Sequence, residues 1–360
     1  MIGLLTLSSA SVVLSYENFG TRLYYFGHQL VYGGVFGMIA LAVTSRIEYR
    51  TWKKYAIWAL IATLALLVAV FIPGLAFEYG GARRWISVGG LTLQPTEVVK
   101  LTFLLYLATW LEKREKGIHD VQAGFLPFLA IIGVIAFLIM LQPDLGTMLV
   151  IISTAILVYF VAGAPWKHLL WLAGAGVIMV ILLIQIAPYR LNRLDVFLNP
   201  EKDPQGIGYQ VDQARLAIGS GGLTGRGIGQ SIQKHNYLPE PIGDSVFAIM
   251  AEELGFVRII VIVLMYAIIA WRGFLIARHA PDLYGRLVAS GITGWIVFQA
   301  FMNMGAISGL IPLTGIPLPF ISYGGSALLF TLAGVGVLLN ISRYADLPST
   351  RASLRHGEHS

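Results

Sequence analysis

The chain has 360 residues, of which 56% are hydrophobic and only 12% are charged. That charged share is about half of what soluble domains carry, so lipid rather than water is expected to be the main solvent. Cysteine is absent, which excludes disulfides, thiolate nucleophiles and cysteine-ligated metal sites. The net charge of +6 arises from residues between hydrophobic segments rather than from a basic polar domain, which argues against nucleic-acid binding.

Apolar segments close to the length that crosses a bilayer recur along the whole chain. We expect about ten transmembrane helices, at residues 2–15, 28–45, 55–73, 97–111, 123–141, 145–163, 166–187, 245–271, 286–307 and 319–341. The first lacks a basic leader and a clear cleavage site, so we interpret it as a retained helix rather than a signal peptide. The predicted fold class is an all-α integral membrane protein, with a single polytopic domain over residues 1–346 and a disordered tail over 347–360.

The positions of the basic residues predict the topology of these helices. If the N-terminus lies inside, alternate loops hold more than half of the 25 Lys and Arg residues, namely Arg46, Arg50, Lys53, Lys54, Lys113, Arg114, Lys116, Lys167, Arg272, Arg278, Arg286, Arg343, Arg351 and Arg355. By the positive-inside rule, both termini are expected in the cytoplasm.

One connection, residues 188–243, is long and lies between the seventh and eighth expected helices, on the extracytoplasmic side. A loop of this length is usually functional. Its glycine-rich run at 219–229 superficially resembles a dinucleotide-binding fingerprint, but no strand–turn–helix unit surrounds it. We expect turns or re-entrant structure instead, with backbone amides free to approach a ligand closely.

Several cations remain on the outer side, where the topology rule does not require them. Arg83, Arg84 and Lys234 are among them. They are either ordinary solvated loop charges or ligands for an anion such as phosphate or pyrophosphate. Trp85, next to the arginine pair, either stacks on a sugar or anchors the chain at the membrane interface.

Charged residues inside membrane spans require an explanation, because each costs about 2.5–3.5 kcal/mol at a helix centre. In the segment Gln94-Pro-Thr-Glu97, the glutamate lies three residues before Lys100 and therefore on the same helical face. The pair is either a local ion pair at a helix start or part of a polar cavity. Asp144, between two apolar spans, and Asp244, at the outer edge of the eighth span, are either helix caps or functional carboxylates.

Two further features complete the set of polar candidates. Glu252 and Glu253 lie deeper in the eighth span, where we expect them to brace helix packing. Residues 309–326 are too rich in proline and glycine for an uninterrupted span, and the hydroxyl of Ser322 could face a ligand or cap the last helix. There is no zinc-binding histidine pair, nucleophile elbow or Walker lysine motif, so hydrolases of those classes and ATP-driven transport lose support.

Taken in order, these segments resemble the SEDS family (shape, elongation, division and sporulation) of cell-wall glycosyltransferases, which includes RodA and FtsW. The resemblance extends over almost the whole chain, through Ser8–Ser11, Gly81–Ile86, Gln94–Glu97 and Leu318–Ser326. Asn199-Pro, Gly208-Tyr-Gln and Tyr237-Leu-Pro-Glu240 are similar to the family's large outer loop. Residues 77–84 and 318–320 are slightly more similar to FtsW than to RodA.

The resemblance implies a ten-helix enzyme of the bacterial cytoplasmic membrane that polymerises peptidoglycan from lipid II beside a class B penicillin-binding protein. The 4-hydroxyl of lipid II would attack the undecaprenyl-pyrophosphate-linked glycan with inversion. The family's catalytic aspartate follows the Leu-Pro-Glu segment and matches Asp244, with Gly243 where threonine is usual. Asp244 is therefore expected to act as general base.

The remaining site predictions concern the substrate and its leaving group. Cationic groups and Mg²⁺ or Mn²⁺ are candidates to stabilise the leaving pyrophosphate, with Glu97 and Asp144 as candidate metal ligands. The predicted substrate-binding residues are Arg83, Arg84, Trp85, Gln94, Glu97, Lys100, Asp144, Lys234 and Ser322. Two alternatives remain open, namely a flippase for lipid II and a scaffold of the division or elongation machinery that has no chemistry of its own.

Overall fold

The protein was studied as a computed structural model, which describes residues 2–79, 82–88, 91–186, 195–199, 202–203 and 206–346. The predicted disordered tail at 347–360 and the start of the long loop, at 188–194, lie outside the described residues. The chain forms two compact units. The first unit comprises Met1–Gly33, Leu169–Ala267 and Gln299–Gly325, and the second comprises Gly34–His168, Ile268–Phe298 and Ser326–Ser360.

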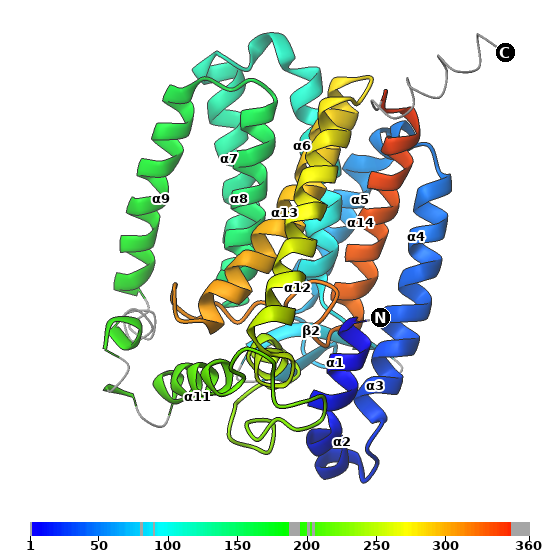
Figure 1. The fold of residues 1–360 in the computed structure, drawn as a ribbon. Helices are drawn as coiled ribbons and strands as arrows, with labels where there is room; N and C mark the ends of the chain where they lie inside the picture. Colours follow the sequence, from blue (N-terminus) through cyan, green and yellow to red (C-terminus); the bar gives the residue numbers. More distant parts are fainter. Residues whose placement is uncertain are drawn as a thin grey trace, which may run out of the picture. The chain divides into compact units, whose positions relative to one another are not determined.

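Helices make up most of both units (Figure 1). Those of the first unit are α1 (Ile2–Ala10), α2 (Val12–Phe19), α3 (Tyr24–His28), α11 (Ile207–Ser220) and most of α9 (Trp166–Ile186). Those of the second are α4 (Phe36–Arg46), α5 (Tyr49–Ala69), α6 (Pro95–Lys113), α7 (Leu126–Met140), α8 (Leu145–Val161) and α14 (Gly325–Tyr344). The unit boundaries divide α12 (Val246–Arg278), α13 (Leu283–Ile307) and the π-helical segment η1 (Gln29–Val35). Two short segments of the second unit, η2 (Glu115–Gly117) and η3 (Val121–Phe125), precede α7.

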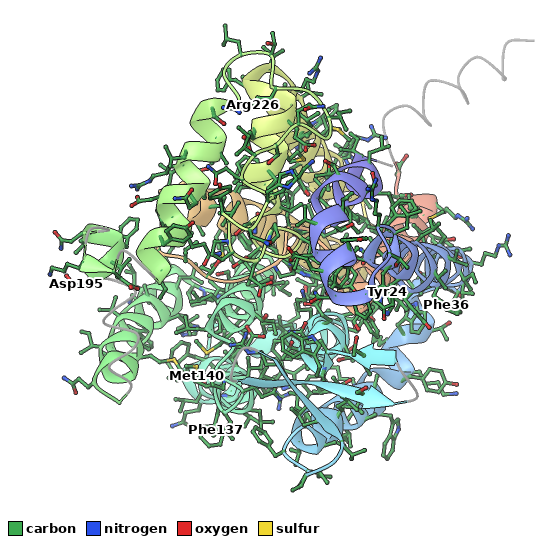
Figure 2. The ribbon with its side chains drawn as sticks, turned by 90° about the horizontal axis from the view of Figure 1, so that it is seen from below. Tyr24, Phe36, Phe137, Met140, Asp195 and Arg226 are labelled. Carbon is green, nitrogen blue, oxygen red and sulfur yellow. The ribbon has the colours of Figure 1, made fainter. Side chains whose placement is uncertain are left out.

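The expected membrane spans overlap these helices, and the first, at 2–15, is divided between α1 and α2. Among the described residues, six helical segments are long and apolar enough to cross a membrane: Tyr24–Arg46, Tyr49–Ala69, Val121–Met140, Val246–Arg278, Leu283–Ile307 and Gly325–Tyr344. Apolar side chains such as Phe137 on α7, which is 62% exposed, point outward as a lipid-facing surface requires (Figure 2). The helical, multi-pass membrane fold is confirmed, and the number of ten crossings stays a prediction.

The structure corrects the expected start of the last span. Residues 309–324 form no helix, and α14 begins only at Gly325 rather than at residue 319. Phe320 has a φ of 67°, a left-handed conformation that a right-handed helix cannot contain, which explains the later start.

A three-stranded antiparallel sheet lies between α5 and α6 in the chain, and sequence analysis did not foresee it. Its strands are β1 (Ala76–Tyr79), β2 (Ala82–Val88) and β3 (Leu91–Leu93), in the order β1-β2-β3. Trp85 pairs with Phe77, and Ile86 pairs with Ala76 on one side and Leu93 on the other. The strands are short and separated by glycines, so they lack a long alternating pattern that would indicate a sheet.

The glycine-rich run of the long loop packs against an interruption in α12. Gly255 has a φ of 77°, which breaks the helix. The backbone of residues 222–227 fills this gap, because Gly227 N–H donates to the Glu253 carbonyl at 3.0 Å and Phe256 N–H donates to the Gly222 carbonyl at 2.9 Å. A Cβ at Gly225 would lie 2.3 Å from the Glu253 carbonyl oxygen, so a side chain there has no room. The expectation that the amides of this run are free to approach a ligand is corrected for Arg226 and Gly227, whose amides donate to the Glu252 and Glu253 carbonyls of α12.

Candidate functional site

Asp244 lies in the turn that leads into α12, and its side chain is half-buried. Gln210 reaches it from α11, with its Nε2 3.4 Å from Asp244 Oδ1. The same Nε2 donates to Ser245 Oγ at 3.0 Å, and Ser245 Oγ lies 3.5 Å from Asp244 Oδ1. These donors all face one carboxylate oxygen, which fixes the direction of the carboxylate and leaves Oδ2 to the segment around Gly315.

The backbone at Asp244 is held by α13. Asn303 Nδ2 donates to the carbonyls of Asp244 and Ile316, each at 2.8 Å. Gly315 has a φ of 68°, and a Cβ built on it would lie 3.8 Å from Asp244 Oδ2. The segment before α14 therefore runs past the carboxylate at close range, and a glycine at its nearest point keeps the approach to Oδ2 uncrowded.

The surroundings of Asp244 change its acidity. Burial raises the pKa of Asp244 to about 6, and the negative charge of Glu240 acts in the same direction. Hydrogen bonds from its own backbone, Gln210 and Ser245 lower the pKa and only partly offset burial. A carboxylate with a pKa near the working pH is a far better proton acceptor than an ordinary aspartate.

Gly243 is compatible with a side chain, even though the family's usual threonine is missing here. Its φ is not in the left-handed region, and its N–H donates to the Glu240 carbonyl at 3.1 Å. The nearest atom to a Cβ built at this position is Glu240 Oε2, at 3.3 Å. Because that atom ends a flexible side chain, glycine chiefly gives Glu240 more room beside Asp244.

Lys234 occupies a different part of the first unit, where it is buried. Its Nζ donates to the Gly229 carbonyl at 2.7 Å, to Ser9 Oγ at 2.9 Å and to Glu253 Oε1 at 3.0 Å. An ammonium has three hydrogens, so these acceptors use all of them. The structure thus gives Lys234 a bracing role, and its contact with substrate stays a prediction.

The two glutamates of α12 have protein donors, as their predicted role in packing requires. Glu253 Oε1 also accepts from Ser9 Oγ at 2.6 Å. Glu252 accepts from Ser231 Oγ at 2.5 Å and from the backbone amide of Ile232 at 3.1 Å. Ser322 is likewise buried, and its Oγ accepts from the Leu318 amide at 2.7 Å. Its hydroxyl oxygen braces the turn before α14.

The second unit contains a buried ion pair on α6. Glu97 Oε2 and Lys100 Nζ are 2.7 Å apart, and the two side chains are 1% and 3% exposed. Lys100 Nζ also lies 5.1 Å from the centre of the Trp295 ring, an attractive cation–π distance. A small cavity beside Lys100 is lined by Phe103, Thr154 and Trp295 among others. Of the two alternatives left open by the sequence, the local ion pair is present.

Arg84 and Asp144 are brought close to one another in the same unit. Arg84 donates to the backbone carbonyls of Gln142 and Pro143, at 3.0 and 2.5 Å. Asp144 Oδ1 accepts from the Thr147 amide at 3.2 Å, so it caps α8 as its position predicted. Its other oxygen, Oδ2, is buried and has no hydrogen-bond partner among the described residues. That free oxygen is the structural reason to keep Asp144 as a candidate ligand.

The remaining predicted residues lie near the sheet. The backbone amide of Gln94 lies 3.4 Å from Ser326 Oγ, which itself donates to the Thr92 carbonyl at 3.0 Å. Trp85 is partly buried on β2. Arg83 belongs to the same strand, and its side chain lies outside the described residues. No three His, Asp or Glu side chains gather among the described residues as a metal site of the protein's own would require.

Sequence reasoning missed two residues that position Asp244. Gln210 lies within the Gly208-Tyr-Gln motif that was noted for the outer loop, so a signal was present. Asn303 carries no charge, so the search for charged residues in the spans does not find it. The only signal in the sequence is a polar amide within an apolar helix.

Comparison with known proteins shows which family these features belong to. The sequence model of the family described as "Cell cycle protein" (FTSW_RODA_SPOVE) matches residues 1–347. The chain is 44% identical to stage V sporulation protein E of Bacillus subtilis over 344 residues, which cover 96% of this chain and 94% of that one. It is 40% identical to the probable peptidoglycan glycosyltransferase FtsW of Trichlorobacter lovleyi, over 94% of this chain and 89% of that one.

Solved structures agree with this assignment. A chain from a structure described as "Structural coordination of polymerization and crosslinking by a peptidoglycan synthase complex" has a TM-score of 0.76 and 32% identity, covering 96% of this chain and 98% of that one. The rod shape determining protein RodA of Thermus thermophilus has a TM-score of 0.67 and 31% identity, covering 96% of this chain and 97% of that one. The chain therefore belongs to the SEDS family of FtsW, RodA and SpoVE proteins.

Proposed function

We propose that this protein is a peptidoglycan glycosyltransferase that transfers a lipid-linked glycan strand onto the 4-hydroxyl of lipid II and releases undecaprenyl pyrophosphate. Membership of the family supports the reaction class. The observation that carries the proposal is the oriented, half-buried carboxylate of Asp244, whose pKa of about 6 suits it to accept a proton near neutral pH.

In the proposed step, Asp244 removes the proton from the 4-hydroxyl of lipid II. At the same time the oxygen of that hydroxyl bonds to the anomeric carbon of the glycan strand. The bond from that carbon to the pyrophosphate oxygen breaks, and its electron pair leaves with the pyrophosphate. Attack opposite the leaving group inverts the anomeric centre. General-base catalysis of this kind contributes about 10²–10⁴-fold to the rate.

Asn303 and Gln210 would act as positioning residues in this step. Asn303 fixes the backbone of Asp244, and Gln210 fixes one carboxylate oxygen. The base can then meet the hydroxyl in one orientation, which lowers the entropic part of the barrier. Contact of Arg84 and Lys100 with the leaving pyrophosphate, where cations would stabilise the developing charge, stays a prediction from the sequence.

A divalent cation would help to neutralise the pyrophosphate. The described residues offer no ligand cluster for one, so we derive no step through it, and the requirement for Mg²⁺ or Mn²⁺ stays a prediction. A cation in this class of site often takes one or two carboxylates and fills its remaining positions with substrate phosphates and water. Asp144 Oδ2 is the candidate carboxylate oxygen.

We further propose a class B penicillin-binding protein as the partner and the bacterial cytoplasmic membrane as the location. One similar solved chain comes from a complex described as coordinating polymerization and crosslinking, which supports a partner that crosslinks. The excess of Lys and Arg in alternate loops supports cytoplasmic termini.

The decisive experiment measures glycan chains formed from lipid II by the purified protein with its cognate partner. Asp244→Asn should abolish product. Asp212→Asn removes the same charge from an exposed aspartate of α11 and should not abolish product. Product at the normal rate from Asp244→Asn would end the catalytic assignment. Translocation of lipid II in liposomes without polymerisation would favour the flippase, whose support weakens because Glu252 and Glu253 are engaged by protein donors.

A further inference from the structure

An open hollow of about 640 Å³ lies between the start of α5 and the end of α6, within the second unit. The catalytic proposal does not use it. Its lining residues fall into two groups, five cations and four others. The cations are Arg50, Lys53, Lys54, Lys113 and Arg114, and the others are Ile57, Tyr106, Thr109 and Trp110.

The cations of the hollow are only partly neutralised. Arg50 pairs with Glu48 and Asp282, and Lys53 pairs with Glu112. Lys54, Lys113 and Arg114 are exposed, and no carboxylate of the described residues lies within salt-bridge distance of them. The hollow therefore keeps an excess of positive charge that would attract an anion.

The helix that supplies three of these cations makes the excess more costly. The first turn of α5 contains no acidic residue, and Arg50, Lys53 and Lys54 follow its start at Tyr49. Cations near a helix N-terminus are opposed by the helix dipole, whereas an anion there is favoured. Lys113 and Arg114, which have no carboxylate partner among the described residues, complete the opposite wall at the end of α6. A bound anion would relieve the repulsion on both walls.

The rest of the hollow is suited to an amphiphile rather than to a free anion. Ile57 and the indole of Trp110 provide apolar lining beside the cations, and the Arg114 guanidinium lies 4.6 Å from the centre of the Trp110 ring. Beyond Ile57, the same helix exposes Trp58 and Ile61, with exposed fractions of 68% and 48%. A headgroup in the charged part would thus continue into acyl chains along an apolar helix face. Basic pockets between membrane helices bind lipid headgroups in this way.

We propose that this hollow binds the phosphodiester headgroup of an anionic glycerophospholipid, with Lys54, Lys113 and Arg114 as its main contacts. By the predicted topology the lipid belongs to the cytoplasmic leaflet, on the side opposite the proposed chemistry. The positive-inside rule by itself accounts for cations at the predicted cytoplasmic ends of α5 and α6. It does not require cations at the start of α5 and the end of α6 to share one hollow that also has apolar lining.

The test is a titration of the purified full-length protein in detergent, followed by native mass spectrometry. The probes are dioleoyl phosphatidylglycerol, dioleoyl phosphatidylcholine as the zwitterionic control, and glycerophosphoglycerol, the deacylated phosphodiester headgroup of phosphatidylglycerol. The triple variant Lys54→Gln, Lys113→Gln, Arg114→Gln should bind phosphatidylglycerol at least about tenfold more weakly than the wild type, since each lost cation removes a favourable contact with the phosphate.

A matched control removes the same charge elsewhere on the same predicted side. Lys167, Arg278 and Arg286 are exposed and do not line the hollow, so their triple glutamine variant should keep its affinity within about twofold of wild type. Equal losses in both triple variants would show general attraction to anionic lipid and overturn the proposal. Binding of glycerophosphoglycerol as tight as that of phosphatidylglycerol would overturn the lipid assignment.

Single variants keep the test valid if a triple variant folds poorly. Lys54→Gln and Arg114→Gln, each checked by size-exclusion chromatography, should weaken phosphatidylglycerol binding several-fold and leave phosphatidylcholine binding unchanged. Phosphatidylglycerol affinity that is unchanged in both would contradict the proposal.

Discussion

The side-chain amide of Asn303 donates a hydrogen bond of 2.8 Å to the backbone carbonyl of Asp244. The same nitrogen donates to the Ile316 carbonyl, so one buried side chain joins the proposed base to the segment that runs past it. The backbone carbonyls of Asp244 and Ile316 are thereby both held by α13, a helix that is itself largely buried. Positioning of this kind is needed when a reacting hydroxyl must meet one carboxylate oxygen.

Replacing Asn303 should therefore impair the reaction more than substrate binding. We expect Asn303→Ala to lower kcat on the order of 10²-fold, because a shift of about 1 Å in a catalytic group costs that much, while KM for lipid II stays close to wild type. Gln299→Ala is the control, since Gln299 donates to the Pro317 carbonyl but not to Asp244. An equal loss of kcat in the control would mean that the loop, rather than Asp244, is what Asn303 supports.

The pH dependence of the reaction should follow Asp244. A general base must be deprotonated to act, so kcat/KM should rise with pH, pass half of its maximum near the Asp244 pKa of about 6, and level off above it. The charge of Glu240 raises that pKa, so Glu240→Gln should move the rising limb to lower pH. The hydrogen bond from Gln210 lowers it, so Gln210→Ala should move the limb to higher pH.

The measurement is a pH–rate profile of lipid II polymerisation for the wild type and both variants. Asp212→Asn serves as the control for a charge change on the same helix as Gln210. If the rising limb stays in place in both variants, or moves in the same direction in both, Asp244 does not set the pH dependence of the reaction.

Features that depend on local spacing could be predicted from the sequence. Hydrophobic length located most of the helices, although it did not predict α11 and it placed the start of the last span at 319 instead of 325. The three-residue spacing of Glu97 and Lys100 placed both on one helical face, where the structure shows an ion pair at 2.7 Å. Asp144 lies directly before α8 and caps it, as a carboxylate at a helix start commonly does. The ion pair and the helix cap each involve residues within about one helical turn of each other, and hydrophobic length is read along one continuous segment.

Features that depend on distant partners could not be predicted. Lys234 is bonded to Ser9, which is 225 positions away, and to Glu253, which is 19 positions away. In the sequence it is only one more cation in a polar loop, so it was assigned to substrate. The glycine-rich run had the same difficulty, because its partner is the interruption of α12 at Gly255 and not a ligand.

The buried pair of Lys234 and Glu253 gives a stability prediction. Lys234→Met should leave Glu253 as an unpaired buried charge and lower the free energy of unfolding by about 3–5 kcal/mol. The double variant Lys234→Met, Glu253→Gln should recover part of that loss, because the uncompensated charge is gone. Thermal unfolding in detergent measures both. A raised KM for lipid II with an unchanged Tm in Lys234→Met would instead support the predicted contact with substrate.

Two glycines of the long loop allow backbone strain to be separated from packing. Gly225 and Gly229 have almost the same left-handed conformation, with φ of 83° and 84°. A Cβ at Gly225 would lie 2.3 Å from the Glu253 carbonyl oxygen, whereas nothing lies within 4 Å of a Cβ at Gly229. Alanine at either position pays about 1–2 kcal/mol of conformational strain, and only Gly225→Ala must also push the loop out of the gap in α12.

We therefore expect the free energy of unfolding of Gly225→Ala to be lower than that of Gly229→Ala by about 1–3 kcal/mol, which is typical of overpacking. The extra loss should be local, because the displaced loop carries the amides of Arg226 and Gly227 that donate to the Glu252 and Glu253 carbonyls. Hydrogen exchange of those two amides should accelerate in Gly225→Ala and remain slow in Gly229→Ala. Equal stability and equal exchange in the two variants would show that the loop does not depend on its seat in α12.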